Sequence, residues 1–173
     1  MLILGIDPGL RCTGYGGINL DGRSVAVREA GVIRTASSDL AERLRELASG
    51  MREVIEAVSP EVVVVECLYS HYKHPRTAIL MGHARGALLL AASESGIPVV
   101  DYPATRIKKS LTGNGRATKG QMQRAILQTL KMSKMPEPAD VADALAVALC
   151  HANVCLHDKL VSGGSARMAA RKS

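Results

Sequence analysis

The chain begins with MLILGIDPG, residues 1–9, an apolar run that ends on Asp7 and a Pro-Gly turn. A second apolar run, VVVV at 62–65, ends in the same way on Glu66. A continuous β-branched run is typical of a strand that is buried on both faces in the middle of a sheet. If the two strands are parallel neighbours, their carboxyl ends meet at one edge of the sheet. The two runs therefore predict that Asp7 and Glu66 lie together at that edge.

The surrounding pattern predicts an α/β fold with a mixed sheet. Segments 12–20 and 24–35 resemble strands joined at Asp21-Gly22, a dipeptide that accepts the positive φ angles of a hairpin turn. The sheet thus opens as an antiparallel meander. Apolar residues at helical spacing predict a helix from Leu40 to the break at Pro60, capped by Asp39. Further helices are expected near 75–95, 105–111, 118–131 and 138–157, with a short strand at 97–102.

Length and composition predict one compact domain. The chain has 173 residues, of which 47% are hydrophobic, enough for one core and too few for two ordinary domains. We expect the domain to span 1–158 and a flexible basic tail to span 159–173, because Gly, Ser, Ala, Arg and Lys dominate the end of the chain. Gly82 and Gly86, one turn apart in a helix, are expected either to let another element approach or simply to pack in the core.

Charge and cysteine content narrow the functional classes. A net charge of +6 favours a polyanionic partner such as nucleic acid, although a modest positive excess also serves solubility. The four cysteines form no Cys-x-x-Cys pair, and their spacing matches no usual zinc pattern. No run approaches the ~20 apolar residues of a membrane span, and no basic region leads into a secretory apolar stretch. A soluble cytoplasmic protein is expected.

Two further acidic residues open the last predicted helix. Asp140 and Asp143 are three residues apart, so they project from one helical face and can lie over the sheet edge that carries Asp7 and Glu66. Clustered carboxylates favour Mg²⁺ or Mn²⁺, and four of them can hold two such ions about 4 Å apart, the spacing used in phosphodiester hydrolysis. Taken singly, each residue also fits a turn or a helix amino end. The set of four predicts a metal-dependent catalytic site.

Five segments together resemble the RuvC family of Holliday-junction resolvases: ILGIDPG at 3–9, TGYG at 13–16, VE at 65–66, GHARG at 82–86 and ADVADALA at 139–146. The likeness spans residues 1 to about 158. It implies an RNase H-like fold with a mixed five-stranded sheet, in which strands 1–3 form an antiparallel meander and the later strands are parallel. It also assigns Asp7, Glu66, Asp140 and Asp143 as catalytic residues.

The resemblance carries functional expectations as well. It implies a homodimer that depends on Mg²⁺ or Mn²⁺, two ions per site, and that makes paired symmetric incisions in a four-way DNA junction. The products carry 5′-phosphate and 3′-hydroxyl ends. It implies cooperation with a branch-migration motor of the RuvA and RuvB type. Two identical sites suit the roughly two-fold symmetry of the junction.

Two basic regions are candidates for DNA contact. The segment after Glu66 combines rings that can stack on unpaired bases with cationic groups for phosphates. Its candidates are Tyr69, Tyr72, Lys73 and Arg76. RuvC-like proteins commonly have phenylalanine where Tyr69 stands here. A second region holds Lys108, Lys109, Arg116 and Lys119. By resemblance, Lys108 and Lys119 lie near the DNA and the active site, and Lys119 opposes the dipole of its helix unless an anion is close.

Alternative interpretations remain open at this stage. A noncatalytic junction-binding protein would keep the fold without the chemistry, and an actin-like ATPase fragment would share the opening meander. The chain is too short for the two domains of the latter class, and all four acidic residues are present. Arg85 suits either a phosphate contact or an ion pair. His151 shares a helical face with Asp143 and is expected either to approach the metals or, more simply, to pack in the core.

Overall fold

The computed structural model describes the backbone of residues 1–67 and 75–169 and the side chains of these residues as far as 158. Five strands form one sheet in the order β3-β2-β1-β4-β5. They are β1 Leu2–Asp7, β2 Cys12–Asp21, β3 Ser24–Arg34, β4 Val62–Glu66 and β5 Val99–Tyr102. The first three strands pair antiparallel, whereas β4 runs parallel to both β1 and β5. The predicted mixed sheet is confirmed.

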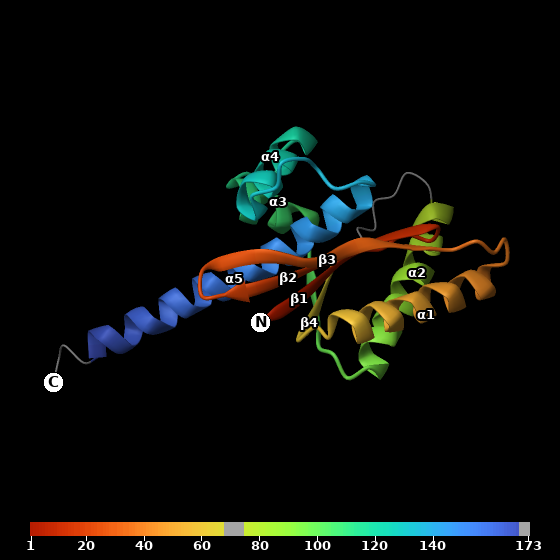
Figure 1. The fold of residues 1–173 in the computed structure, drawn as a ribbon, viewed down its shortest axis with the longest axis horizontal. Helices are drawn as coiled ribbons and strands as arrows, with labels where there is room; N and C mark the ends of the chain where they lie inside the picture. The colour runs from red at the N-terminus through yellow and green to blue at the C-terminus, as the bar shows by residue number, and fades with distance from the viewer. Residues whose placement is uncertain (68–74, 170–173) are drawn as a thin grey trace.

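Helices cover both faces of the sheet (Figure 1). They are α1 Leu40–Val58, α2 Pro75–Glu94, α3 Ala104–Thr112, α4 Lys119–Leu130 and α5 Ala139–Ala169. The pair α1 and α2 lies on one face, and α5 crosses the other with α3 and α4 packed beside it. The predicted cap of α1 is present, since Asp39 accepts a hydrogen bond from the Glu42 amide. Helix α4 begins with a reciprocal capping box between Thr118 and Gln121. The side chain of Glu42 forms an ion pair with Arg45, one turn along the exposed side of α1.

Each face of the sheet has its own hydrophobic core. On the α5 face, Ile3, Ile18 and Val64 pack against Leu145 and Leu149, all buried. The opposite core contains residues of β1, β4, α1 and α2: Leu4, Ile6, Val63, Val65, Leu47, Met51 and Leu88. The alternation along β1 and β4 therefore divides their apolar side chains between two layers, as a sheet covered on both faces requires.

Glycines allow α5 to lie directly on the strands. A Cβ atom on Gly5 would lie 2.1 Å from the carbonyl oxygen of Ala144, and one on Gly14 would lie 2.0 Å from that of Asp140. Both distances are far below van der Waals contact, so these positions accept no side chain while α5 keeps its place. The distance between α5 and the sheet is thus set by direct contact of their main chains.

Three expectations from the sequence are corrected. The last helix continues to Ala169 instead of ending near His157, because Leu, Ala, Lys and Arg have high intrinsic helix propensity. The division into a domain of 1–158 and a flexible tail of 159–173 stays a prediction. A Cβ on Gly82 or Gly86 meets nothing within 4 Å, so no other element of the described chain approaches there.

The third correction concerns hydropathy. Residues 139–158 of α5 have a mean hydropathy of 1.5, and by length and composition this stretch is apolar enough to cross a membrane. The expectation that no run reaches that level was wrong. More than half of the stretch is buried inside the fold, against β1 and β2, which is the usual environment of a core helix.

Candidate active site

The parallel pairing of β1 and β4 brings Asp7 and Glu66 to one edge of the sheet. Ile6 is opposite Val65 in the register, and each acidic residue is the next one along its strand. Both side chains are partly buried. The prediction that these two residues meet at the rim is therefore confirmed by the strand order.

A buried threonine fixes the turn that follows Asp7. Thr13 is fully buried, and its hydroxyl donates to the carbonyl of Gly9 at 2.7 Å and accepts from the Gly9 amide at 3.1 Å. These two hydrogen bonds close the loop between β1 and β2 and satisfy polar groups that burial would otherwise leave unpaired. The backbone that carries Asp7 is thereby held at the rim.

The amino end of α5 lies over the same rim. Gly14 pairs with Asp7 across β1 and β2, and the backbone of Asp140 lies directly on Gly14. Asp140 is partly buried and Asp143, one helical turn further, is exposed. The route from Asp7 through Gly14 to Asp140 is therefore entirely backbone contact.

The proximity of these carboxylates raises the pKa values of three of them. The pKa of Asp7 is raised to about 7, first by burial and then by the charges of Asp143, Glu66 and Asp140. The pKa of Glu66 is raised by burial and by Asp143. Although Asp143 is exposed as a residue, partial desolvation of its carboxyl group by the surrounding protein raises its pKa, and the charge of Asp140 adds to this effect. Like charges disfavour ionisation of a neighbouring carboxyl. All four acidic residues therefore lie within electrostatic range at one end of the sheet.

Two lysines counter this negative charge. Lys108 of α3 lowers the pKa of Glu66 against the effect of burial, and Lys119 of α4 does the same for Asp143. Lys119 is the first residue of α4, where a cation opposes the helix dipole by about 0.3–1 kcal/mol. The facing Asp143 offsets that cost. The two predicted lysines thus flank the acidic rim.

A cavity of about 310 Å³ adjoins the rim. It lies between α3, α4 and the start of α5. Its walls include apolar residues of all three helices, among them Ile107, Met122 and Ile126, and its edge includes Glu66 and Asp143. Sequence patterns contained no sign of this space, because it arises from three segments that meet only in the folded chain.

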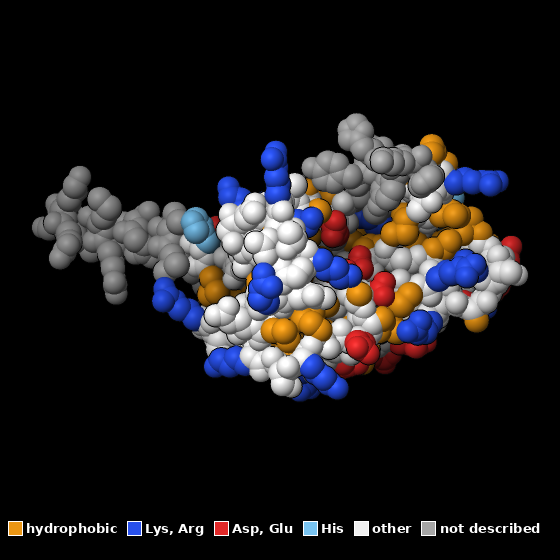
Figure 2. Space-filling view, turned by 90° about the horizontal axis from the view of Figure 1, so that it is seen from above, with side chains coloured by type: hydrophobic (Ala, Val, Ile, Leu, Met, Phe, Trp, Pro, Cys, Tyr) orange, Lys and Arg blue, Asp and Glu red, His pale blue; other side chains and the backbone are white. Residues whose placement is uncertain are grey.

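The remaining basic candidates are placed as follows. Arg76 is exposed in the first turn of α2, Lys109 is exposed on α3, and Arg116 is exposed in the turn before α4. Tyr69, Tyr72 and Lys73 lie outside the described residues. Figure 2 shows acidic side chains in a hollow with lysine and arginine side chains around it. This distribution suits an anionic ligand that contacts the basic margin while one of its groups reaches the acidic centre.

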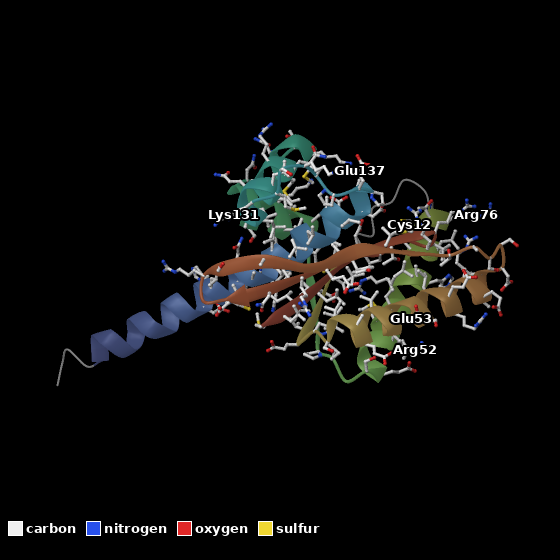
Figure 3. All side chains as sticks on the ribbon, in the orientation of Figure 1. Cys12, Arg52, Glu53, Arg76, Lys131 and Glu137 are labelled. Carbon is white, nitrogen blue, oxygen red and sulfur yellow. The ribbon has the colours of Figure 1, made fainter. Side chains whose placement is uncertain are left out.

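Three other polar contacts clarify open questions. His151 shares a 2.8 Å hydrogen bond with the Tyr102 hydroxyl, so its packing interpretation holds. Arg85 forms an ion pair with Asp101. The pKa of the Cys12 thiol is raised, first by burial and then by the charge of the nearby Asp140. Figure 3 shows Cys12 and Arg76 toward the same end of the molecule. A thiol contact to a catalytic candidate has no signal in the sequence, because it depends on how α5 meets β2.

The donor chemistry of the rim fits hard divalent cations. Four carboxylates offer only oxygen ligands, the type that Mg²⁺ and Mn²⁺ prefer. In the described part of the chain, no three His, Cys, Asp or Glu side chains converge closely enough, as they stand, to hold one ion. The shared sheet edge and the raised pKa of Asp7 show proximity, whereas the assignment of the four residues as a joint ligand set remains a proposal.

Comparisons with known proteins give the family. The model of the family "Crossover junction endodeoxyribonuclease RuvC" matches residues 3–151. The protein of that name from Rhodopirellula baltica is 54% identical over 149 residues, covering 86% of this chain and 84% of its own. The one from Shewanella amazonensis is 43% identical over 163 residues, covering 94% and 92%.

Solved structures agree with the sequence relatives. Thermus thermophilus RuvC superposes with a TM-score of 0.82 at 33% identity, covering 90% of this chain and 95% of its own. The same protein in complex with a Holliday junction substrate gives a TM-score of 0.85, also at 33% identity, covering 91% and 96%. The yeast mitochondrial Holliday junction resolvase, at 14% identity and a TM-score of 0.64, shares the fold. By sequence and by structure, this chain belongs to the RuvC family of crossover junction endodeoxyribonucleases.

Proposed function

We propose that this protein is a structure-selective endonuclease that resolves four-way DNA junctions by paired, symmetric phosphodiester hydrolysis, leaving 5′-phosphate and 3′-hydroxyl ends. The observation that carries the proposal is the gathering of Asp7, Glu66, Asp140 and Asp143 at one sheet edge, where each of the other three raises the pKa of Asp7. The relative solved with a Holliday junction has the same fold over most of its length.

The four carboxylates are proposed to hold two Mg²⁺ or Mn²⁺ ions. When bound, such ions supply a nucleophilic water and stabilise the leaving oxygen of the phosphodiester. Asp7 and Glu66 present their carboxylates from rigid strand ends, and Asp140 and Asp143 present theirs from a helix held against Gly14. Ligands placed on strands and a packed helix vary little in position, which is what chemistry at one phosphorus atom requires.

The chain's own cations would position the substrate. Lys108 and Lys119 flank the rim and can attract the phosphates on either side of the cleaved bond. Arg76, Lys109 and Arg116 are exposed farther out and can contact the DNA arms. Tyr69, Tyr72 and Lys73 keep their predicted role at the junction centre as part of the same proposal. We propose that the protein acts in the bacterial cytoplasm. We also propose that it works together with a branch-migration motor of the RuvA and RuvB type.

Asp7→Asn tests the catalytic assignment. Loss of one carboxylate from the most strongly coupled position should reduce junction cleavage by roughly 10³-fold or more, whereas binding persists or tightens because a negative charge near the phosphate is removed. The measurement is nick mapping on a labelled four-way junction and a linear duplex with each metal, together with a binding isotherm.

A matched control is Asp21→Asn at the exposed end of β2, beside the turn to β3 and far from the rim. It makes the same chemical change and should leave cleavage unaltered. Full activity in Asp7→Asn would refute the metal-site assignment. Loss of cleavage together with loss of binding would favour a structural role for Asp7 instead.

We also propose a homodimer built on α2. Ile79 and Leu90 of this helix are each 59% exposed, and Gly82, His83 and Gly86 lie on the same face between them. The spacing 79, 83, 86, 90 follows one helical stripe. An apolar stripe with two bare glycines suits close contact with a second helix of the same kind. Two active sites joined in this way would face two strands of a two-fold symmetric junction.

Ile79→Lys tests the dimer. The residue is exposed in the single chain, so the fold should persist, while a charge in the interface shifts the protein to monomers and converts paired incisions into single nicks. Sedimentation and a supercoiled cruciform substrate measure both effects. Val27→Lys makes the same change at another exposed apolar residue, on β3, and should leave the dimer intact. A dimer that survives Ile79→Lys would place the interface elsewhere.

A further inference from the structure

The last residue of the edge strand β3 places a cation beside the acidic rim. Arg34 is paired with Cys12 across β3 and β2, so the two side chains project from the same face of the sheet. Gly14, two residues from Cys12 and therefore on that face as well, lies against the backbone of Asp140. Arg34 thus belongs to the face that carries the start of α5, one strand beyond the strand that Asp140 covers.

The charges of Arg34 and of the rim act together on the Cys12 thiol. Burial and the charges of Asp140 and Asp7 raise the pKa of this thiol, whereas the charge of Arg34 lowers it. The guanidinium and two rim carboxylates are therefore within electrostatic range of one side chain that lies between them. Figure 3 labels Cys12, which marks this end of the sheet.

The backbone that carries Arg34 is fixed to the turn that follows Asp7. The amide of Thr35 donates to the carbonyl of Arg11 at 3.2 Å, and the Thr35 hydroxyl donates to the carbonyl of Leu10 at 2.8 Å. Pairing between the two segments thus continues past the end of β3. Because the main chain is already in place, only the side chain of Arg34 must be ordered when it binds a ligand.

The guanidinium of Arg34 is exposed and forms no ion pair or hydrogen bond with the described residues. Glu46 of α1 borders the same groove, but one of its carboxylate oxygens accepts from the amides of Ala36 and Ser37. An arginine fixed at its backbone and free at its head can bind an anion from outside the chain. Its planar donors match the oxygens of a phosphate.

We propose that Arg34 binds a backbone phosphate of the cleaved DNA strand, about two or three nucleotides from the cut, and so holds that strand across the rim. The proposal rests on the proposed junction cleavage and adds a positioning residue to it. Strand β3 is two strand spacings from β1, about 10 Å. The charges of one DNA strand recur about every 3.4 Å along the helix axis. A strand whose cleaved phosphate lies at Asp7 therefore passes Arg34 within a few phosphates.

This role differs from that of the lysines beside the carboxylates. Lys108 and Lys119 act on Glu66 and Asp143 themselves, whereas Arg34 is on the far side of β2 and touches no reacting group. A contact of that kind strengthens the bound substrate and the transition state equally, so it changes affinity more than rate. The acidic rim repels an approaching phosphate backbone, and a fixed cation on its β3 side offsets this repulsion.

Two substitutions of Arg34 and a neutral phosphate analogue test the proposal. Arg34→Gln removes the charge, and Arg34→Lys keeps it without the planar fork. Arg28→Gln is the matched control, because Arg28 is exposed in the same strand and about 20 Å farther from this end. Each variant is given four-way junctions in which one phosphate of the cleaved strand, at successive positions on either side of the cut, is a methylphosphonate. Binding is measured at several salt concentrations, cleavage in single turnover with saturating protein, and folding by melting curves.

The expected result is a loss of affinity that depends on one phosphate. Arg34→Gln should bind the unmodified junction about tenfold more weakly, reduce the salt slope of binding by about one, and keep its saturated cleavage rate within about twofold. Arg34→Lys should keep the salt slope and recover part of the affinity. In the wild type, a methylphosphonate at one position away from the cut should cost about tenfold in affinity, and it should cost Arg34→Gln nothing further. Arg28→Gln should match the wild type throughout.

Other results would overturn the proposal. If Arg34→Gln binds with wild-type affinity and salt slope, or if no methylphosphonate position abolishes the difference between the two proteins, Arg34 contacts no phosphate. A lower saturated rate at unchanged affinity would mean that Arg34 supports the rim and not the substrate. If the coupled phosphate is the one that Lys119→Gln marks, Arg34 does not extend the grip along the strand. Failure of the wild type to cut any junction would instead reject the proposed function, and the binding measurements then still test the contact without catalysis.

Discussion

The two faces of the sheet hold their helices in different ways. On the α5 face, Gly5 and Gly14 lie against the main chain of the helix, so that an added Cβ would be 2.1 Å or less from a carbonyl oxygen. On the α1 face, the nearest atom to a Cβ on Gly17 is a methyl carbon of Val58 at 3.1 Å. Side chains can rotate to relieve a contact, whereas helix backbone moves only as a unit. The face that carries the acidic residues is therefore the one with the least freedom.

Of the substitutions that test this comparison, Gly14→Ala should have the largest effect, on both stability and cleavage. The added methyl group pushes the start of α5 away from β2, and with it Asp140, so overpacking should cost about 1–3 kcal/mol of stability. A displacement near 1 Å at a catalytic group can lower the rate by about 10²-fold. Urea unfolding and junction cleavage measure the two effects in one preparation.

The matched control lies in the same strand on the opposite face. Gly17→Ala needs only a small movement of the Val58 methyl group, and the loss of chain entropy in the unfolded state partly offsets it, so the change in stability should stay within about 1 kcal/mol with cleavage unaltered. Equal losses of cleavage in the two variants would mean that the α5 face has no special role in placing the site.

Without metal, Asp7→Asn should raise the free energy of unfolding by an intermediate amount. The pKa of Asp7 rises from 3.8 to about 7 on folding, so the ionised carboxylate opposes folding. This opposition is absent below pH 3.8 and is complete above about pH 7. After allowance for solvent screening, Asp7→Asn should be about 1–2 kcal/mol more stable than the wild type at pH 8.

The measurement is the urea midpoint at pH 4 and pH 8 with a chelator present. The gain of Asp7→Asn should nearly vanish at pH 4, where the folded wild type is neutral at this position. Asp21→Asn provides the comparison at the exposed end of β2 and should show little change at either pH. A gain of equal size at both pH values would indicate a packing effect and not the charge of Asp7.

His151 should give the smallest effect. It lies on α5 beyond the site, and burial lowers its pKa from 6.5 while its ring bonds the Tyr102 hydroxyl. A histidine with a lowered pKa in the folded state contributes stability above pH 6.5 that is lost as the pH falls through the folded-state value. His151→Gln should therefore reduce the acid-side loss of stability, as measured by melting temperature between pH 8 and pH 5.

The exposed His157 on the same helix provides the control. His157→Gln should follow the wild-type profile over the same pH range. If His151→Gln also follows that profile, protonation of the buried ring does not contribute to acid unfolding, and the acid side must be assigned to other groups.

Local patterns in the sequence were sufficient for most of the fold. The runs at 1–9 and 62–66 predicted the two central strands and the meeting of Asp7 with Glu66, and Asp39 marked the start of α1. Each of these signals depends on neighbours within a few residues, or on the general rule for parallel strands. Assignment to the family came from the combined motifs, not from any one of them.

Features that depend on three-dimensional packing were beyond the sequence. The proximity of Cys12 to Asp140 and the cavity between α3, α4 and α5 both require segments far apart in the chain to meet. Gly82 and Gly86 were expected to admit another element or to pack in the core, yet within the described single chain they face open space. Two glycines one turn apart allow close approach of a second helix, whether that helix belongs to the same chain or to another copy. The sequence alone therefore cannot say which of the two it is.

The order of the elements along the chain, with α5 after every strand of the sheet, has a consequence for biosynthesis. Two of the four carboxylates proposed to hold the ions are on this helix, which is translated after every strand of the sheet. A chain that is still attached to the ribosome, with its last helix inside the exit tunnel, has only Asp7 and Glu66 in place. With the proposed ion site, a nascent chain would be unable to cut DNA until α5 has been translated and has docked on the sheet.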